Sequence, residues 1–409
     1  MSVFNIFKKT GPGIIVAATG LGAGDIVAAS AAGAQAGTVL LWAVVFGGLL
    51  KYGLTEGIGR WQLATDTTLL EGWIEKLPKF FSWYFIVYMF LWTFMVAAAM
   101  MAACGLAAYA FFPVLSVTQW GIIHALFALV IVWFGAYKAL ETAMKFFIGL
   151  MFLTVLYCAL RVMPDLTVIA SGMFIPRVPE SGMAYVLSVI GGVGGSITIM
   201  SYGYWMREAG WKGKEMMSTM RWDLGIAYGL TALFGIAIII VSAGVQPEVV
   251  SGNNMALAVA DQLVPVMGET GKWVFLFGFW GAVFSSMIGV WHGVPFLFAN
   301  FVIHYRKHTH LIETRGSISR SWAYRAYLVY LAILPMSLLR LERPVWIVII
   351  YTITGAFFMP LLAALLLYMN NNRRWLENAA NTWFSKSLLI ACMLVFGYLL
   401  IVQLQGQFL

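Results

Sequence analysis

The run Thr19-Gly20-Leu21-Gly22-Ala23-Gly24-Asp25 places an acid inside an apolar segment that three glycine residues interrupt. The flanking stretches 14–18 and 26–32 carry no charge, so we expect Asp25 near the middle of a bilayer. A carboxylate at that depth is costly and persists where it faces a polar cavity or a partner. The glycines disfavour a continuous helix here, and unwound backbone at membrane depth lines a cavity or lies within protein. The run therefore indicates the substrate site of a transporter, at a break in the first membrane helix.

The composition of the whole chain also indicates a membrane protein. Of the 409 residues, 61% are hydrophobic and 10% are charged, and the mean hydropathy is +0.86. A soluble domain carries about 25% charged residues. We count eleven apolar segments long enough to cross a bilayer, centred near residues 21, 46, 97, 127, 152, 195, 235, 285, 331, 357 and 396. The predicted fold class is an all-α membrane protein of about eleven transmembrane helices.

The basic residues predict the orientation of these segments. If the N-terminus is cytoplasmic, the loops on that side and the adjoining helix ends collect 20 of the 25 Lys and Arg residues. This asymmetry follows the positive-inside rule, so we expect the N-terminus inside and the C-terminus outside. It also accounts for the net charge of +8 without a nucleic-acid partner. We expect an integral protein of the bacterial inner (plasma) membrane, with the lipid bilayer as its partner and no obligatory protein partner.

A second interrupted segment runs over residues 188–205. It has five glycines in the thirteen residues from Gly191 to Gly203. A group of polar residues and one methionine flanks Gly203 and consists of Thr198, Met200, Ser201, Tyr202 and Tyr204. The glycines alone are typical of close helix packing. The two breaks, however, fall in the first and sixth segments, which are the corresponding members of two inverted five-helix repeats. We expect one transporter domain over 1–409, with repeats at 1–163 and 181–368 and an additional C-terminal helix at 386–405.

Three stretches resemble the Nramp divalent-metal transporters. Residues 11–18 (GPGIIVAA), continued by 32–37 (AGAQAG), are similar to the first helix of that family, and 135–141 (GAYKALE) resembles the end of its fourth helix. The resemblance implies the inverted-repeat leucine-transporter-type fold. It also implies a divalent cation as the cargo of a secondary transporter that works by alternating access.

The sequence departs from the family pattern at the metal site itself. Where Nramp transporters carry Asp-Pro-Gly-Asn, this chain has Gly22-Ala23-Gly24-Asp25, so glycine replaces the aspartate and an acid replaces the asparagine. The family's Met-Pro-His aligns with Ile199-Met200-Ser201, and its helix-six histidines align with Ser201 and Met206. Segment 83–110 lacks the proton-relay carboxylate of the family. The chain resembles an outlying branch of the family.

The residues at the two breaks predict a site dominated by oxygen atoms. The candidate ligands are Asp25, Thr198, Met200, Ser201, Tyr202 and the carbonyl group of Gly22. Hard cations such as Mg²⁺ and Mn²⁺ prefer oxygen ligands, whereas a thioether favours softer metals. We therefore expect a cation of the Mn²⁺, Mg²⁺ or Fe²⁺ class. Met200 packs in the helix on one interpretation and binds metal on the other, and Asp25 could instead cap the half-helix that follows it.

Other ionisable residues are candidates for a gate or a proton path. Lys51 and Glu56 lie toward the cytoplasmic end of the second segment, where they are expected to pair or to be solvated. Arg207 and Glu208 follow the second break, as a gate or as a solvated helix end. His124 and His292 are the histidines at membrane depth and could relay protons; packing is the alternative. With so few titratable groups, we expect weak or absent proton coupling.

No enzyme motif is present in the sequence: it has no phosphate-binding loop, zinc-binding His-Glu motif or nucleophile elbow. We therefore expect no catalytic residues and no cofactor, with the metal ion as substrate. The alternative function is transport of another small solute in the same fold, with Asp25 binding an amine or a coupling ion. A channel or a metal sensor fits paired broken helices less well.

Overall fold

The computed structural model describes residues 11–13, 22–135, 138–179, 182–192, 197–245, 248, 252–307 and 315–408. Within these ranges the regular structure is helical and no strand occurs, which confirms the predicted all-α class. The principal helices and 3₁₀ segments are α3 (Ala23–Ala36), η1 (Gly37–Leu40), α4 (Leu41–Thr65), α5 (Leu69–Lys76), α6 (Lys79–Phe111), α7 (Val117–Phe134), α8 (Lys138–Arg161), α9 (Leu166–Phe174), α10 (Met183–Gly192), η2 (Ile197–Ser201), α11 (Tyr202–Glu208), η3 (Lys214–Met216), α12 (Met217–Ser242), α14 (Met255–Asp261), α15 (Val264–Lys307), α16 (Arg315–Arg320), α17 (Trp322–Ile333), η4 (Leu334–Leu341), α18 (Pro344–Ala356), α19 (Met359–Asn370), α20 (Arg373–Leu376), η5 (Glu377–Ala379) and α21 (Trp383–Phe408).

Nine helical stretches of the described chain are long and apolar enough to cross a membrane, or ten if α8 and α9 form one bent span. The predicted count of eleven is therefore not confirmed. One reason is that α3, η1 and α4 join into a single 42-residue stretch, which the sequence pattern had divided into two segments. The chain bends by 118° between the two helices of this pair.

Local sequence signals explain where several helices begin and end. Helix α7 starts after Ser116, whose hydroxyl accepts the N–H of Gln119 while the Gln119 side chain accepts the N–H of Ser116. Such reciprocal caps satisfy N–H groups that have no partner inside the helix. The same helix ends at Gly135, whose φ of 72° is a left-handed conformation that glycine adopts without strain. Helix α5 begins with an equivalent cap.

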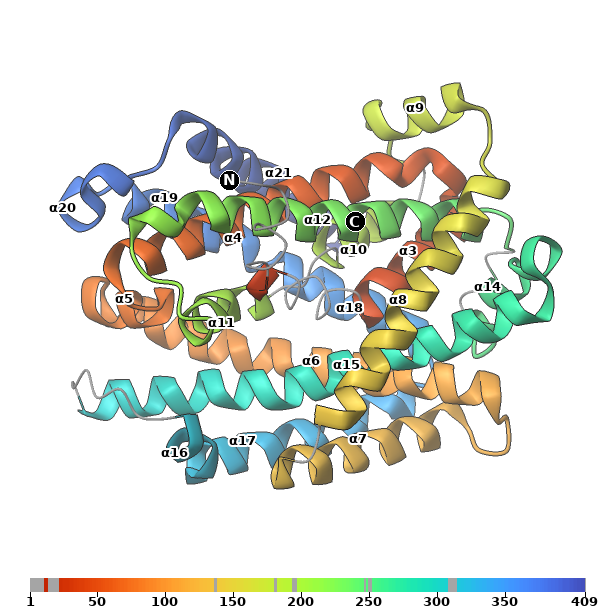
Figure 1. Cartoon of the computed structure of the whole chain (residues 1–409), viewed down its shortest axis with the longest axis horizontal. Coiled ribbons are helices and arrows are strands. Elements are labelled where there is room, and N and C mark those ends of the chain that lie inside the picture. The colour runs from red at the N-terminus through yellow and green to blue at the C-terminus, as the bar shows by residue number, and fades with distance from the viewer. Residues whose placement is uncertain are drawn as a thin grey trace.

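Many of the long helices lie side by side (Figure 1). Helix α12 packs on α3 and α4, α10 packs on α3 and α18, and α18 also contacts α6. Helix α15 packs against α6 and against α8, which crosses the other helices obliquely in Figure 1. Apolar side chains from most helices form one extended core. The three cysteines Cys104, Cys158 and Cys392 are free and buried in it, as small hydrophobic residues are expected to be.

Candidate functional site

Asp25 lies in the first turn of α3, directly after the first break. Its side chain is buried, with 3% of the residue exposed. The N-terminus of a helix carries partial positive charge, which stabilises a carboxylate there. Gly22 is the N-cap, and its carbonyl accepts the N–H of Ile26 at 3.1 Å. The Gly22 oxygen is thus engaged in the first helical turn and has one remaining lone pair for a ligand. Residues 14–21 of the run lie outside the described residues.

The end of α10 lies against the start of α3 and against α18. A Cβ atom at Gly191 would come 2.5 Å from the carbonyl oxygen of Thr352, and one at Gly192 would come 3.1 Å from that of Gly24. Only glycine allows backbones to approach so closely without a shift. Ser188, one turn earlier, shares a hydrogen bond of 2.6 Å with the hydroxyl of Thr352. These contacts bring the first and second broken segments together beside Asp25.

Lys51 of α4 reaches into the same region. The residue is fully buried, with 0% exposed, and its Nζ donates a hydrogen bond to the carbonyl oxygen of Gly191 at 2.9 Å. Its charge interacts with that of Asp25, which also lies within electrostatic range of the hydroxyl groups of Tyr228 and Tyr351. The expectation that Lys51 is solvated is wrong, because the residue is fully buried and its ammonium group binds the carbonyl of Gly191. A lysine within an apolar helix is costly at membrane depth, and that signal could have identified it.

The candidate ligands on the second segment differ in their placement. Thr198 is half-buried in η2, while Met200 and Ser201 are buried, with 2% and 6% exposed. Met200 belongs to the hydrophobic core. Residues 193–196, where the sequence predicts the second break, lie outside the described residues. Tyr202 is fully buried, and its hydroxyl donates to the carboxylate of Asp223 at 3.1 Å. The hydroxyl of Tyr202 therefore binds Asp223 rather than a group beside Asp25.

Asp223 of α12 binds the start of the first broken segment as well. Its Oδ2 accepts the N–H of Gly13 at 2.6 Å, and its Oδ1 accepts that of Gly11 at 3.3 Å. A Cβ atom at Gly13 would lie 2.6 Å from Oδ2, so this contact requires glycine. One buried carboxylate therefore joins the segment before the first break to Tyr202 just after the second. The sequence analysis missed this residue, although an acid that begins an apolar helix is itself a signal.

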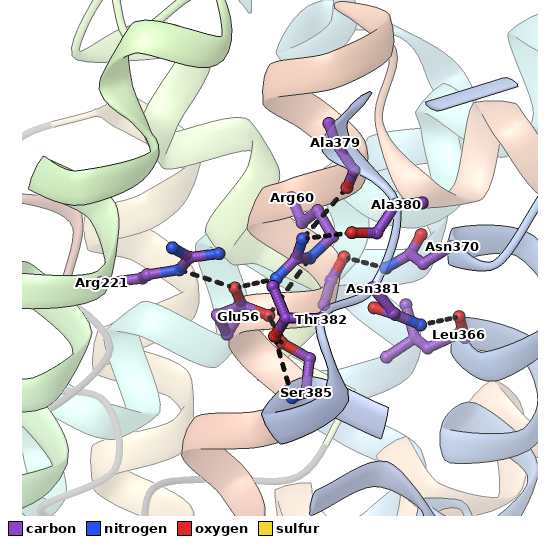
Figure 2. Close-up of polar contacts among 11 residues, drawn as sticks. Glu56, Arg60, Arg221, Leu366, Asn370, Ala379, Ala380, Asn381, Thr382 and Ser385 are labelled. Atoms are coloured by element: carbon purple, nitrogen blue, oxygen red, sulfur yellow. Dashed lines mark hydrogen bonds and ion pairs between the residues drawn. The ribbon is translucent and has the colours of Figure 1, made fainter. Parts of the chain in front are cut away.

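Glu56 belongs to a buried ionic network rather than to a pair with Lys51, which corrects the prediction for both residues. Its carboxylate binds Arg60 at 2.5 Å and Arg221 at 3.0 Å, and it accepts the hydroxyl of Ser385 at 3.3 Å (Figure 2). All five N–H donors of Arg60 have acceptors, namely Glu56, Ser385 and the carbonyl groups of Ala379 and Ala380. The network fastens α4 to α12 and to the start of α21, a role in which Glu56 is a structural anchor.

Arg207, the candidate gate residue on α11, binds the carboxylate of Glu71 on α5 at 2.9 and 3.2 Å. Its side chain is 35% exposed, so this pair lies at the edge of the protein interior. The side chain of Glu208 lies outside the described residues. Nearby in sequence, Lys214 binds the exposed Glu377 at 2.7 Å, and this ammonium group lowers the pKa of Glu377 from its ordinary value.

The two candidate histidines occupy different environments. His124 is nearly buried: its Nδ1 lies 2.7 Å from the carbonyl oxygen of Trp120, and its Nε2 accepts the indole N–H of Trp280 at 3.0 Å. A neutral imidazole with its proton on Nδ1 satisfies both contacts, which favours a packing role. His292 is half-buried on α15, and its backbone carbonyl accepts the hydroxyl of Tyr324 at 3.5 Å. The ring contacts of His124 are thus with α7 and α15 rather than with Asp25.

No group of three or more His, Cys, Asp or Glu side chains that could hold a metal occurs in the described part of the chain. A cation at the breaks would therefore depend on one carboxylate, that of Asp25, with hydroxyl and carbonyl oxygens and retained water as further ligands. Mg²⁺ in proteins is usually bound in this way, through one or two carboxylates and several waters.

Comparisons with known proteins agree with this architecture. Solved structures similar to the chain include the manganese transporter of Eremococcus coleocola in complex with an aromatic bis-isothiourea substituted compound (TM-score 0.75, 17% identity, covering 98% of this chain and 87% of that one). A mutant of that transporter gives a TM-score of 0.76 at 15% identity over the same shares. MhsT in complex with L-phenylalanine gives a TM-score of 0.63 at 15% identity over 96% and 97% of the two chains. At these identities the likeness establishes the fold.

The sequence itself matches the family model described as natural resistance-associated macrophage protein-like (Nramp) over residues 13–405. No curated protein matches the chain. The match confirms the resemblance that the first helix indicated. The chain therefore belongs to the Nramp family, and it is a membrane transporter rather than an enzyme.

Proposed function

We propose that this protein carries divalent cations of the Mn²⁺, Mg²⁺ or Fe²⁺ class across the membrane as a secondary transporter. Metal-ion transport is the activity of the Nramp family, and the manganese transporter of similar fold supports the choice of ions. The observation that carries the proposal is the buried carboxylate of Asp25 in the first turn of α3, beside the end of α10. A buried acid between two broken helices is a binding site for a cation at the midplane.

The ligands that we propose are oxygen atoms. Asp25 supplies the charge, Thr198 and Ser201 supply hydroxyl groups, and carbonyl oxygens at the breaks complete a partly hydrated shell. Alternating access would proceed by movement of the two broken segments relative to α6 and α15. Asp223 supports this assignment, because it joins both segments on one side of the site. The proposal includes inverted repeats at 1–163 and 181–368 and a cytoplasmic N-terminus.

Transport of a small solute bearing an amine is the second candidate, and Lys51 favours it. The ammonium group of Lys51, near Asp25, repels a dication about twice as strongly as a singly charged amine at the same distance, because Coulomb repulsion scales with charge. Uptake into proteoliposomes distinguishes the two functions. A metal transporter accumulates divalent cations, whereas an amine transporter accumulates organic amines and no divalent cations.

Selectivity among metals tests the role of Met200. Because this thioether lies in the hydrophobic core, we expect weaker discrimination against hard cations than a thioether-lined site would show. In a competition assay, Mg²⁺ should reduce Mn²⁺ uptake, and Met200→Ala should leave the competition by Cd²⁺ unchanged. Met369→Ala, which alters another buried methionine, is the matched control. Cd²⁺ that outcompetes Mn²⁺, and loses this advantage in Met200→Ala, would mean that the thioether binds metal.

Proton coupling is expected to be weak or absent. Helix α6 contains no Asp, Glu or His residue, and the nitrogen atoms of His124 are engaged by Trp120 and Trp280. A proton released at Asp25 therefore finds neither an acid on α6 nor a free nitrogen of His124 to carry it onward. Proteoliposomes containing a pH-sensitive dye should show cargo uptake without matching acidification. Stoichiometric proton influx that persists in a His124→Ala, His292→Ala double variant would contradict this expectation.

A further inference from the structure

Among the described residues, Lys51 is the buried basic group near Asp25. The proposed transport of cations assigns no role to this lysine. Its ammonium group takes the position that a cation cargo would need: it is fully buried, donates to Gly191, and is within electrostatic range of Asp25. A lysine at a helix surface normally extends its ammonium group toward water. Here the side chain instead points into the protein, toward the breaks.

The acceptor of Lys51 is itself suited to a cation. Gly191 lies in the last described turn of α10, and its carbonyl oxygen accepts the ammonium group of Lys51. The carboxylate of Asp25 adds a full negative charge nearby. Carbonyl and carboxylate oxygens are the ligands that hard divalent cations prefer. Lys51 contacts the first of these groups and lies near the second.

Helix α12 connects the surroundings of Lys51 and Asp25. The hydroxyl of Thr55, one turn after Lys51 on α4, donates to the backbone carbonyl of Lys51 at 2.9 Å and shares a 2.7 Å hydrogen bond with Tyr228 of α12. Tyr228 in turn lies within electrostatic range of Asp25. Because α12 packs on both α3 and α4, Tyr228 lies close to the turn that carries the lysine and to the acid.

We propose that the ammonium group of Lys51 is a built-in competitor for the cargo cation at the carboxylate of Asp25 and the carbonyl of Gly191. This inference rests on the proposed cation transport and identifies the residue that sets its affinity. In the empty carrier, Lys51 neutralises Asp25; when a divalent cation binds, the ammonium group is displaced from the carboxylate.

The arrangement has a consequence for the transport cycle. Moving net charge across a membrane potential costs free energy in proportion to the charge. A carrier with a bare carboxylate would move a negative charge on its empty return, whereas the pair of Asp25 and Lys51 moves none. The same neutralisation lowers the affinity for cargo, so that release on the far side is easier.

The test is calorimetric titration of Mn²⁺ into the purified full-length protein. Lys51→Met keeps most of the side-chain volume and removes the charge. We expect this variant to bind Mn²⁺ roughly tenfold tighter or more, because one adjacent like charge has been removed from a low-dielectric site. Lys51→Gln is a second neutral variant, and Lys51→Arg, which keeps the charge, should bind no tighter than wild type. Lys145→Met, at an exposed lysine on α8, is the matched control and should not change the affinity.

A double variant, Asp25→Asn with Lys51→Met, assigns the gain to the carboxylate and should lose it. If both neutral variants elute as single species on size exclusion and bind Mn²⁺ no tighter than wild type, while Asp25→Asn abolishes binding, the competitor role is overturned and the proposed function stands. If neither wild type nor the neutral variants bind Mn²⁺, Mg²⁺ or Fe²⁺, both proposals fail. Binding that appears only when Lys51 is neutral supports the competitor role.

Discussion

Asp25→Asn is expected to abolish cargo binding and uptake while leaving the protein folded. The substitution keeps the size of the side chain and removes the charge of the single carboxylate that we assign to the site. The loss should exceed the roughly 10–100-fold that removal of an outer-shell partner of a bound metal costs. Mn²⁺ uptake into proteoliposomes and calorimetric titration in detergent measure it, with size-exclusion chromatography as the check on folding.

The matched control is Asp165→Asn, the same change at an exposed acid that precedes α9. This variant should transport as wild type does. Asp25→Asn that transports normally would show that the cation binds elsewhere, and Asp25→Asn that fails to fold would assign the acid a structural role as a helix cap. Asp25→Ala, which removes both the charge and the hydrogen-bonding group, should behave as Asp25→Asn does if the charge is what matters.

Arg60→Met is expected to produce the largest loss of stability. Arg60 is 2% exposed, and its removal would leave the carboxylate of Glu56 with Arg221 as its remaining cation and the carbonyls of Ala379 and Ala380 without their donor. Removing one partner of a buried ion pair costs roughly 3–5 kcal/mol, and we expect the lower end of that range because Arg221 remains. Thermal unfolding in detergent, followed by tryptophan fluorescence, measures the change.

Two variants calibrate this result. Lys212→Met breaks a pair with Asp66 whose side chains are 65% and 62% exposed, and such surface pairs contribute about 0–1 kcal/mol. The double variant Glu56→Gln, Arg60→Met should recover part of the loss, because it leaves no unpaired buried charge. An Arg60→Met protein that unfolds at the wild-type temperature would contradict the anchoring role of this network.

The sequence predicted the helical membrane fold and the family because both depend on patterns along one chain. Long apolar segments predict spans wherever they occur, and the run 11–18 matches the first helix of the Nramp family. The number of spans was less predictable. Helix α3 passes into α4 through η1 with little polar sequence between them, so hydropathy alone does not fix where one span ends.

The partners of the site residues could not be predicted in the same way, because they depend on contacts between helices. Lys51 lies 26 residues after Asp25 and 140 before Gly191, and nothing in the local sequence specifies that these three meet. Tyr202 was a candidate ligand because it belongs to the polar group of the second segment, but its hydroxyl binds Asp223 on α12. Sequence position placed Glu56 near Lys51, whereas the folded chain places Glu56 against Arg60 and Arg221.

Anomalous diffraction from crystals grown with saturating Mn²⁺ would locate the cargo directly. We predict an anomalous difference peak within coordination distance of the Asp25 carboxylate, between the start of α3 and the end of α10, and no such peak in Asp25→Asn crystals. A peak bound elsewhere in the protein, or one that persists unchanged without the Asp25 charge, would contradict the assignment of this site to the transported cation.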